Sequence, residues 1–145
     1  MIPTCKIIIT AVLQFTWGAL QTVVGAVLTL ILIKRRHFIY RGSVACEWGR
    51  GESLSLGMFI FISEQAQDRL REELCAHEYG HSVQSMLLGP LYLPVIVLPS
   101  ALWCMFPACK RHRSRTGLSY YGFFTERWAN MIAEGLTGER FTILI

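Results

Sequence analysis

The stretch His77-Glu78-Tyr79-Gly80-His81 places two histidines four residues apart, with a glutamate directly after the first. On an α-helix each residue advances by about 100°, so the two imidazoles lie about 40° apart on one face and can reach one metal ion. Glu78 then projects about 100° away from His77, beside the ion rather than onto it. A carboxylate in that place can take a proton from a metal-bound water. The pattern predicts a metal site on a helix.

The residues around this stretch predict a long helix, from Arg69 to Leu88. Asp68 precedes the helix, and acidic residues at its beginning favour the helix dipole. The second half of the segment is apolar on nearly every side, a pattern typical of a helix that is buried all round. Gly89 and Pro90 are expected to end it.

A catalytic zinc site takes three protein ligands and a water, so a third ligand is expected downstream. The nearest carboxylate in a plausible helix is that of Glu126. Asn130 follows one turn later on the same face, where it can hydrogen-bond a ligand imidazole. Glu134 and Glu139 are the alternative carboxylate ligands. His112 lies among basic residues, so we expect it to be solvated.

Other polar side chains are expected to line the cleft around the metal. Gln84 and Ser85 lie within about 80° of the histidine face of the helix. Tyr120, Tyr121 and Tyr92 are candidates for the hydrogen-bond donor that stabilises an oxyanion beside the metal. The alternative for each tyrosine is an interfacial or core aromatic residue.

The N-terminal part of the chain is strongly apolar. The segment 7–33 contains 27 residues without a charge and ends at the basic cluster 34–36. As a helix it would be about 40 Å long, enough to cross a bilayer with some tilt. The basic cluster places its C-terminal end in the cytoplasm by the positive-inside rule. The sequence therefore predicts an N-terminal transmembrane helix as a membrane anchor, residues 1–36, followed by one compact domain, residues 37–145.

A second apolar segment, residues 86–106, is interrupted by Pro94 and Pro99. It either crosses the membrane or enters and leaves on one side. We favour the second, because a re-entrant path keeps the basic clusters 34–36 and 110–115 on the same side. These clusters hold most of the net charge of +4. Beside apolar segments such clusters typically face anionic lipid headgroups, and no nucleic-acid fold signature accompanies them, so we expect no nucleic acid partner.

Two β-prone runs, residues 38–48 and 54–62, flank the turn signal Gly49-Arg50-Gly51 and predict a short β-hairpin. The run 56–62 is expected to be a core strand, with an edge strand that pairs with an extended peptide as the alternative. The predicted fold class is an α+β membrane protein. It comprises the transmembrane helix, the hairpin, a zincin-like active-site helix, the Pro-broken apolar segment and a C-terminal helix that carries the third ligand.

The segment 77–81, followed by Glu126-Arg-Trp-Ala-Asn130, resembles the motifs of the membrane gluzincins typified by CaaX prenyl proteases. In that family the second motif reads Glu-x-x-Ala-Asp, and its glutamate binds zinc. This chain has Asn130 where the family has Asp, and it is much shorter. The chain is also similar to a group of short bacterial membrane proteins with a His-Glu-Tyr-Gly-His motif; the shared residues are 77–84, 88–92, 99–100 and 125–130.

The motif and the resemblance together predict a zinc-dependent membrane metallopeptidase of the gluzincin type. Zn²⁺ would be held by His77, His81 and Glu126, with Glu78 as the general base. We expect a peptide or membrane-protein substrate and a location in the bacterial inner membrane, with the site near the cytoplasmic face; the small size leaves room for an oligomer. The alternative is a zinc-stabilised scaffold or adaptor without turnover. A third reading, an incidental motif, predicts no bound zinc.

Overall fold

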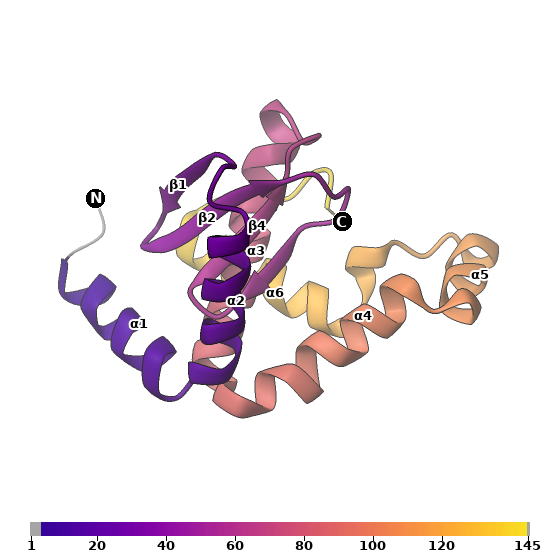
Figure 1. Cartoon of the computed structure of the whole chain (residues 1–145). Coiled ribbons are helices and arrows are strands. Elements are labelled where there is room, and N and C mark those ends of the chain that lie inside the picture. The colour runs from indigo at the N-terminus through magenta and orange to yellow at the C-terminus, as the bar shows by residue number, and fades with distance from the viewer. Residues whose placement is uncertain (1–3, 145) are drawn as a thin grey trace.

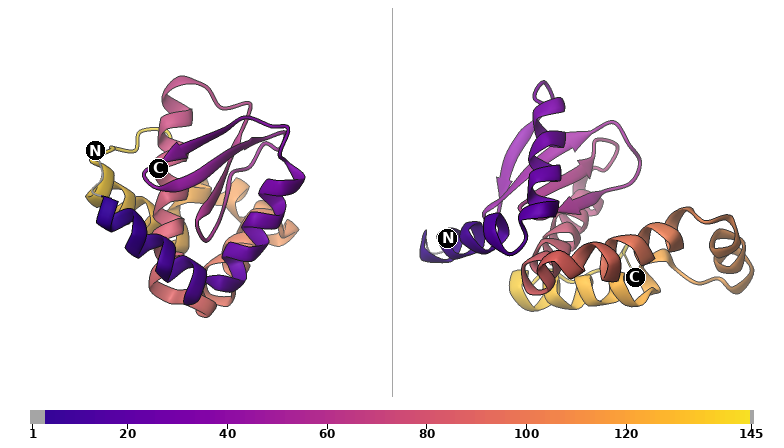
Figure 2. Two further views of the ribbon diagram at one scale, coloured as in Figure 1. Left: turned by 60° about the vertical axis from the view of Figure 1, so that its left-hand side comes forward. Right: turned by 60° about the horizontal axis from the view of Figure 1, so that its bottom comes forward.

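A mixed four-stranded sheet forms the centre of the computed structural model, which describes residues 4–144. The strand order is β1-β2-β4-β3. Helix α2 packs on one face of the sheet and α3 on the other, with α6 beside α3 (Figures 1 and 2). The strands are β1 (His37–Tyr40), β2 (Ser43–Trp48), β3 (Leu54–Leu56) and β4 (Phe59–Ser63).

The helices of the described residues precede and follow this sheet in the chain. Helices α4 and α5 form an arm that extends away from the sheet, and α6 returns along it to α3 (Figure 1). The α-helices are α1 (Thr4–Thr16), α2 (Ala19–Ile31), α3 (Asp68–Leu88), α4 (Leu98–Met105), α5 (Pro107–Thr116) and α6 (Phe124–Thr137). Short helical segments of other types are η1 (Gly89–Leu91), η2 (Leu93–Val97) and η3 (Tyr120–Gly122). The predicted helix 69–88 is thus confirmed to within one residue, as is its end at Gly89.

The prediction of one β-hairpin from residues 38–48 and 54–62 is wrong, because each run folds into a hairpin of its own. The first turns at Arg41 and Gly42, whose φ angles are +50° and +92°, and the second at Gly57, with φ of +62°. Positive φ at consecutive residues gives the turn twist that two-residue hairpins require. Strands β2 and β4 then pair in parallel rather than across Gly49–Gly51. The run 56–62 supplies the interior strand β4, and the two edge strands are β1 and β3.

Successive side chains of β4 point to opposite faces of the sheet and pack into a hydrophobic cluster on each face. Ile60 and Ile62 are fully buried toward α3 and α6, in a cluster with Leu74 and Ala133. Phe61 points the other way, into a cluster with residues of β2, β3 and α2. Period-two burial on both faces explains why this run reads as continuously apolar.

The prediction of a single transmembrane helix over residues 7–33 is wrong. The chain bends by 101° between α1 and α2, at Trp17 and Gly18. Within residues 4–144 no single helix is long and apolar enough to cross a membrane. Two bent helix pairs reach the necessary length and hydropathy only together: Ile7–Thr16 with Ala19–Ile31, and Asp68–Leu91 with Leu93–Met105, bent by 116°. Residues 1–3 of the predicted anchor lie outside the described residues.

Buried polar side chains tie the helices on both sides of the bend to α3. Gln14 donates to the backbone oxygen of Ser82 at 2.8 Å, and Gln21 donates to Ser85 Oγ and to the Gly89 carbonyl oxygen, both at 2.9 Å. Both glutamines are completely buried. Each amide would lose its partners in a low-dielectric environment if its helix moved away from α3. Both α1 and α2 are therefore held against α3 by a buried glutamine.

Helix α6 crosses α3 at Gly80, where the two backbones come unusually close. A Cβ atom placed on Gly80 would lie 2.2 Å from the carbonyl oxygen of Ala129 and 2.9 Å from its carbonyl carbon. Ala129 itself is completely buried. Gly80 therefore makes room for a neighbouring backbone, and this crossing sets the height of α6 relative to the two histidines.

We expect Gly80→Ala to destabilise the fold although alanine favours helices. The new methyl group must displace backbone atoms, so the free energy of unfolding should fall by about 1–3 kcal/mol. Gly135→Ala is the control, since Gly135 lies in α6 with nothing within 4 Å of its would-be Cβ. That variant should gain about 0.5–1 kcal/mol. Urea unfolding of both variants measures the difference, and a neutral or stabilising Gly80→Ala would contradict the close crossing.

Candidate metal centre

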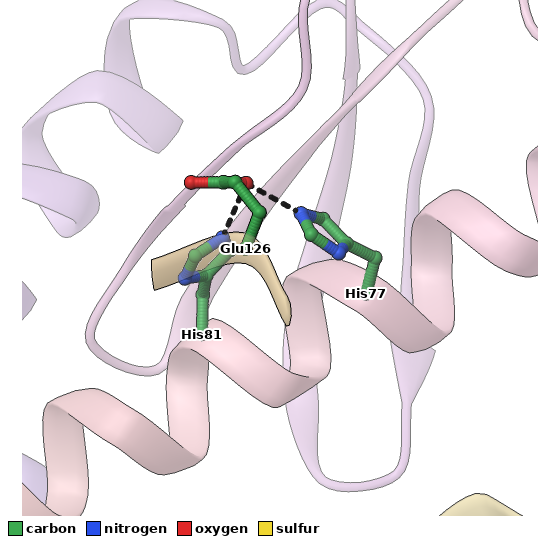
Figure 3. A group of neighbouring side chains, drawn as sticks. All are labelled: His77, His81 and Glu126. Atoms are coloured by element: carbon green, nitrogen blue, oxygen red, sulfur yellow. Dashed lines mark hydrogen bonds and ion pairs between the residues drawn. The ribbon is translucent and has the colours of Figure 1, made fainter. Parts of the chain in front are cut away.

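His77, His81 and Glu126 converge on one point between α3 and α6 (Figure 3). The Oε2 atom of Glu126 lies 3.1 Å from Nε2 of His77 and 3.2 Å from Nε2 of His81. One ligand atom from each residue lies within 4.8 Å of the others, and all three side chains are buried. The ligand atoms around a tetrahedral zinc ion are roughly 3.3 Å apart, so the spacing fits a bound ion of this size. This buried group can hold a metal ion.

An amide side chain orients each of the two imidazoles. Asn130 Oδ1 lies 2.6 Å from Nδ1 of His77, and Asn130 Nδ2 donates to the Leu144 carbonyl oxygen at 2.7 Å. Because only the NH₂ end of an amide can donate to a carbonyl, the oxygen end must face His77. The imidazole then carries its proton on Nδ1 and presents a free lone pair on Nε2.

Gln84 does the same for His81. Its Oε1 atom lies 2.7 Å from Nδ1 of His81, and its Nε2 atom donates to the Thr125 carbonyl oxygen at 3.0 Å. The amide orientation is again fixed by a backbone oxygen. Gln84, which is completely buried, thus supports a histidine rather than lining the cleft as predicted. Both histidines are held with Nε2 free and turned toward the carboxylate.

The second oxygen of Glu126 is held by hydroxyl groups. Ser100 donates to Oε1 of Glu126 at 2.5 Å, and Thr125 donates to the same atom at 3.0 Å. Since the proton of Ser100 is used in this way, Tyr120 donates to Ser100 Oγ, at 2.7 Å. Hydroxyl donors on Oε1 leave Oε2 as the atom that faces the imidazoles. Ser100 also joins α4 to the metal centre.

The electrostatics of this arrangement call for a cation. Two imidazole lone pairs and a carboxylate oxygen face one another, and like partial charges at about 3 Å repel in a buried place. Burial would raise the pKa of Glu126, but its contacts with His77 and His81 outweigh burial and hold the pKa well below its usual range. The carboxyl group is therefore ionised. A metal ion satisfies all three ligands at once.

Glu78 lies beside this group and is not one of its three ligands. It is 4% exposed, and its Oε2 atom has no hydrogen-bond partner among the described residues. Burial, helped by the charge of Glu126 and opposed by His77, raises the pKa of Glu78 to about 8. A buried carboxyl oxygen without a hydrogen-bond partner lowers the free energy of unfolding, so Glu78 destabilises the fold. Such groups gather at functional sites.

A cleft of about 570 Å³ opens over the three ligands and Glu78. Its walls come from α3, β3, η2 and α4. The exposed charged residues that line it are Arg50, Glu52 and Lys110. Its size is that of a pocket for a small ligand or a few residues of a peptide. The apolar lining residues include Leu54, Leu74, Ile96, Val97, Ala101 and Met105.

The three tyrosines predicted near the metal differ in what their hydroxyl groups do. All line the cleft, but Tyr92 donates to the Ser55 carbonyl oxygen at 3.1 Å and Tyr120 to Ser100. The ring of Tyr121 meets that of His77 edge-on, with 5.2 Å between centroids. Burial and the charges of Glu78 and Glu126 raise the pKa of Tyr121, so its hydroxyl group stays a donor.

The structure does not bring the rival ligands to this centre. Glu134 is exposed on α6, Glu139 pairs with Arg69, and His112 is exposed on α5. Ser85 hydrogen-bonds Gln14 instead of lining the cleft. Ser100 was not predicted as a site residue; its only signals in the sequence are its place after Pro99 and the shared run 99–100.

Comparison of the chain with protein-family models, with curated proteins and with solved structures finds no match. The predicted kinship with membrane gluzincins stays a prediction. The chemistry of the centre therefore has to be inferred from its own geometry.

We expect purified protein to hold about one zinc per chain, measured by elemental analysis after dialysis against zinc and then buffer. His81→Ala and Glu126→Ala should each lose the metal, because two remaining ligands do not hold a tetrahedral ion tightly. Glu134→Ala is the control on the same helix and should keep it. Zinc retained by Glu126→Ala would place the third ligand elsewhere.

Proposed function

We propose that this protein is a zinc-dependent peptidase that works in the cleft over α3 and α6. The observation that carries the proposal is the convergence of two imidazole nitrogens and one carboxylate oxygen beside Glu78, whose buried Oε2 atom has no hydrogen-bond partner among the described residues. Three protein ligands with a fourth side open to a cleft are typical of catalytic rather than structural zinc sites. The open fourth side therefore favours a hydrolase over a protein in which zinc has only a structural role.

The choice of zinc follows from the ligand types. Two neutral imidazoles and one carboxylate suit zinc, whereas magnesium and calcium prefer oxygen ligands throughout. Zinc held by His77, His81 and Glu126 would supply a coordinated water of lowered pKa and a Lewis acid for a carbonyl oxygen. Asn130 and Gln84 keep the two Nε2 atoms available for this purpose.

Glu78 handles the proton in this proposal. Its free Oε2 atom accepts a proton from the attacking water and then delivers it to the nitrogen of the leaving amine. A carboxylate whose pKa is raised in this way is a stronger base than an ordinary carboxylate. Tyr121 donates to the oxyanion, since Tyr120 and Tyr92 already use their protons on Ser100 and Ser55.

The edge strand β3 offers a place for an extended peptide. It pairs with β4 on one side only, and Ser53, Leu54 and Ser55 line the cleft. An extended substrate can add to such an edge through backbone hydrogen bonds, with its side chains against the apolar walls.

Glu78→Gln tests whether the centre performs chemistry. The variant should keep one zinc per chain and lose about 10²- to 10⁴-fold in peptide hydrolysis, because the amide cannot accept a proton. The measurement is cleavage of a fluorogenic peptide library beside zinc analysis. Glu72→Gln, on the exposed side of α3, is the control and should be as active as the unmodified protein.

The alternative, a zinc-stabilised scaffold, predicts that Glu78→Gln changes nothing but stability. Removal of an unpartnered buried carboxyl group should then raise the free energy of unfolding with no loss of any other property. Zinc binding without cleavage of any peptide, together with full retention of binding partners by Glu78→Gln, would favour the scaffold.

We also propose that the protein works on the surface of an anionic membrane. Large apolar side chains are exposed by half or more along α1 and α2, at the end of η1 and along α4. They include Ile8, Val12, Phe15, Leu20, Val27, Leu30, Leu91, Leu98 and Met105. An apolar surface of this extent marks an interaction site. Helix α5 adds positive charge at the end of the arm and contains no acidic residue. The match to anionic lipid headgroups favours a bilayer over a protein partner.

Vesicle sedimentation tests this surface. The protein should bind vesicles that contain phosphatidylserine more tightly than vesicles of phosphatidylcholine alone, and salt should weaken the difference. Each basic residue contributes about 1 kcal/mol, so Arg111→Glu with Arg115→Glu should reduce binding at least about 30-fold. Glu134→Ala serves as the control. Equal binding to both vesicle types, or self-association without vesicles, would contradict the lipid surface.

A further inference from the structure

Glu73 is the most highly hydrogen-bonded side chain of α3, and the proposed reaction does not use it. It lies one helical turn before His77 and is completely buried. Its Oε1 atom accepts from the Thr142 backbone N–H at 2.9 Å and hydroxyl group at 2.6 Å, and from Arg69 Nε at 3.1 Å. Its Oε2 atom accepts from the backbone N–H groups of Ile143 at 2.9 Å and Leu144 at 3.0 Å.

These contacts fix the segment 142–144 in place. Three successive N–H groups surround one carboxylate, an arrangement that binds anions strongly. Burial would raise the pKa of Glu73, but the hydrogen bonds from the Thr142 side chain and the three backbone groups lower it to about 2. The carboxylate is therefore charged at any ordinary pH, and the segment is held by charge-assisted hydrogen bonds.

The segment in turn holds the partner of His77. The Leu144 carbonyl oxygen accepts from Asn130 Nδ2, and this contact decides which end of the amide faces the imidazole. If the Leu144 carbonyl moved away, the amide could turn and present its NH₂ group to Nδ1 of His77. The imidazole would then carry its proton on Nε2, and this tautomer cannot bind a metal through Nε2.

We propose that Glu73 is a positioning residue that selects the metal-binding tautomer of His77, acting through the segment 142–144 and Asn130. The role in metal binding rests on the proposed metal centre. The contacts from Glu73 to His77 are seen in the structure without a metal ion. His81 provides an internal comparison, because its amide partner Gln84 is tied to the Thr125 carbonyl oxygen in α6 and not to this segment. The two histidines should therefore respond differently to a change at Glu73.

The decisive experiment is ¹⁵N–¹H correlation spectroscopy of the imidazoles in metal-free protein, at a pH where both rings are neutral. In the unmodified protein His77 and His81 should both be protonated on Nδ1. In Glu73→Gln the amide replaces an acceptor with a donor against backbone N–H groups, so His77 should shift to a mixture of tautomers while His81 is unchanged. An unchanged His77, or an equal change in both rings, would overturn the proposal.

Two further variants guard against a simple loss of stability. Phe61→Leu weakens the core cluster on the opposite face of the sheet and should leave both tautomers unchanged. Thr142→Val removes one hydrogen bond to Glu73 and leaves the Glu73 carboxylate charged. It should therefore shift the tautomer equilibrium of His77 in the same direction but by less. A tautomer change in Phe61→Leu as large as that in Glu73→Gln would reduce the effect to general loosening and overturn the proposal.

Zinc affinity, from competition with a chromophoric chelator, gives the second readout. Loss of an outer contact of a ligand histidine typically costs about 10- to 100-fold in affinity, so Glu73→Gln should bind zinc that much more weakly and Phe61→Leu as tightly as before. If the unmodified protein binds no zinc, the proposed peptidase fails, while the tautomer spectra still decide the role of Glu73. Equal zinc affinity in Glu73→Gln and the unmodified protein would contradict that role.

Discussion

The close crossing of α3 and α6 is the constraint on which the rest of the molecule depends. Gly80 has no side chain, so the backbone at Ala129 lies against α3. This approach brings Glu126 and Asn130, one turn apart on α6, to His81 and His77, one turn apart on α3. Two helices with matching periodicity thus bring the three ligands and an orienting amide together without any loop.

Polar contacts around this crossing join several parts of the fold. Gln14 and Gln21 hydrogen-bond α3 from α1 and α2, Ser100 joins α4 to the carboxylate of Glu126, and Glu73 holds the segment 142–144. Among the described residues, Glu78 is the acidic side chain with a buried oxygen atom that has no hydrogen-bond partner. A buried carboxyl oxygen left without a partner beside three metal-ligand side chains is a candidate for chemistry.

Local patterns in the sequence were sufficient for α3, for its end at Gly89 and for the shared face of His77 and His81, because each depends on residues close in the chain; Glu126 was chosen as the nearest carboxylate in a plausible helix. The same reasoning failed where tertiary contacts decide. Residues 7–33 read as one apolar helix, but the helices on either side of Gly18 hydrogen-bond residues of α3 some 65 residues away. The hairpins depend on positive φ at Arg41 and Gly57. The roles of Ser100 and Glu73 could not be predicted from their neighbours in the sequence, since each acts on residues distant in the chain.

The most direct test of the central claim is zinc K-edge X-ray absorption spectroscopy of the zinc-loaded protein. The account predicts scattering from two imidazole rings and a first shell of nitrogen and oxygen atoms at about 2.0–2.1 Å, with no sulfur. His81→Ala should lose the imidazole signal together with the metal. A sulfur shell at about 2.3 Å, or a shell of oxygen atoms without imidazole scattering, would contradict the proposed centre.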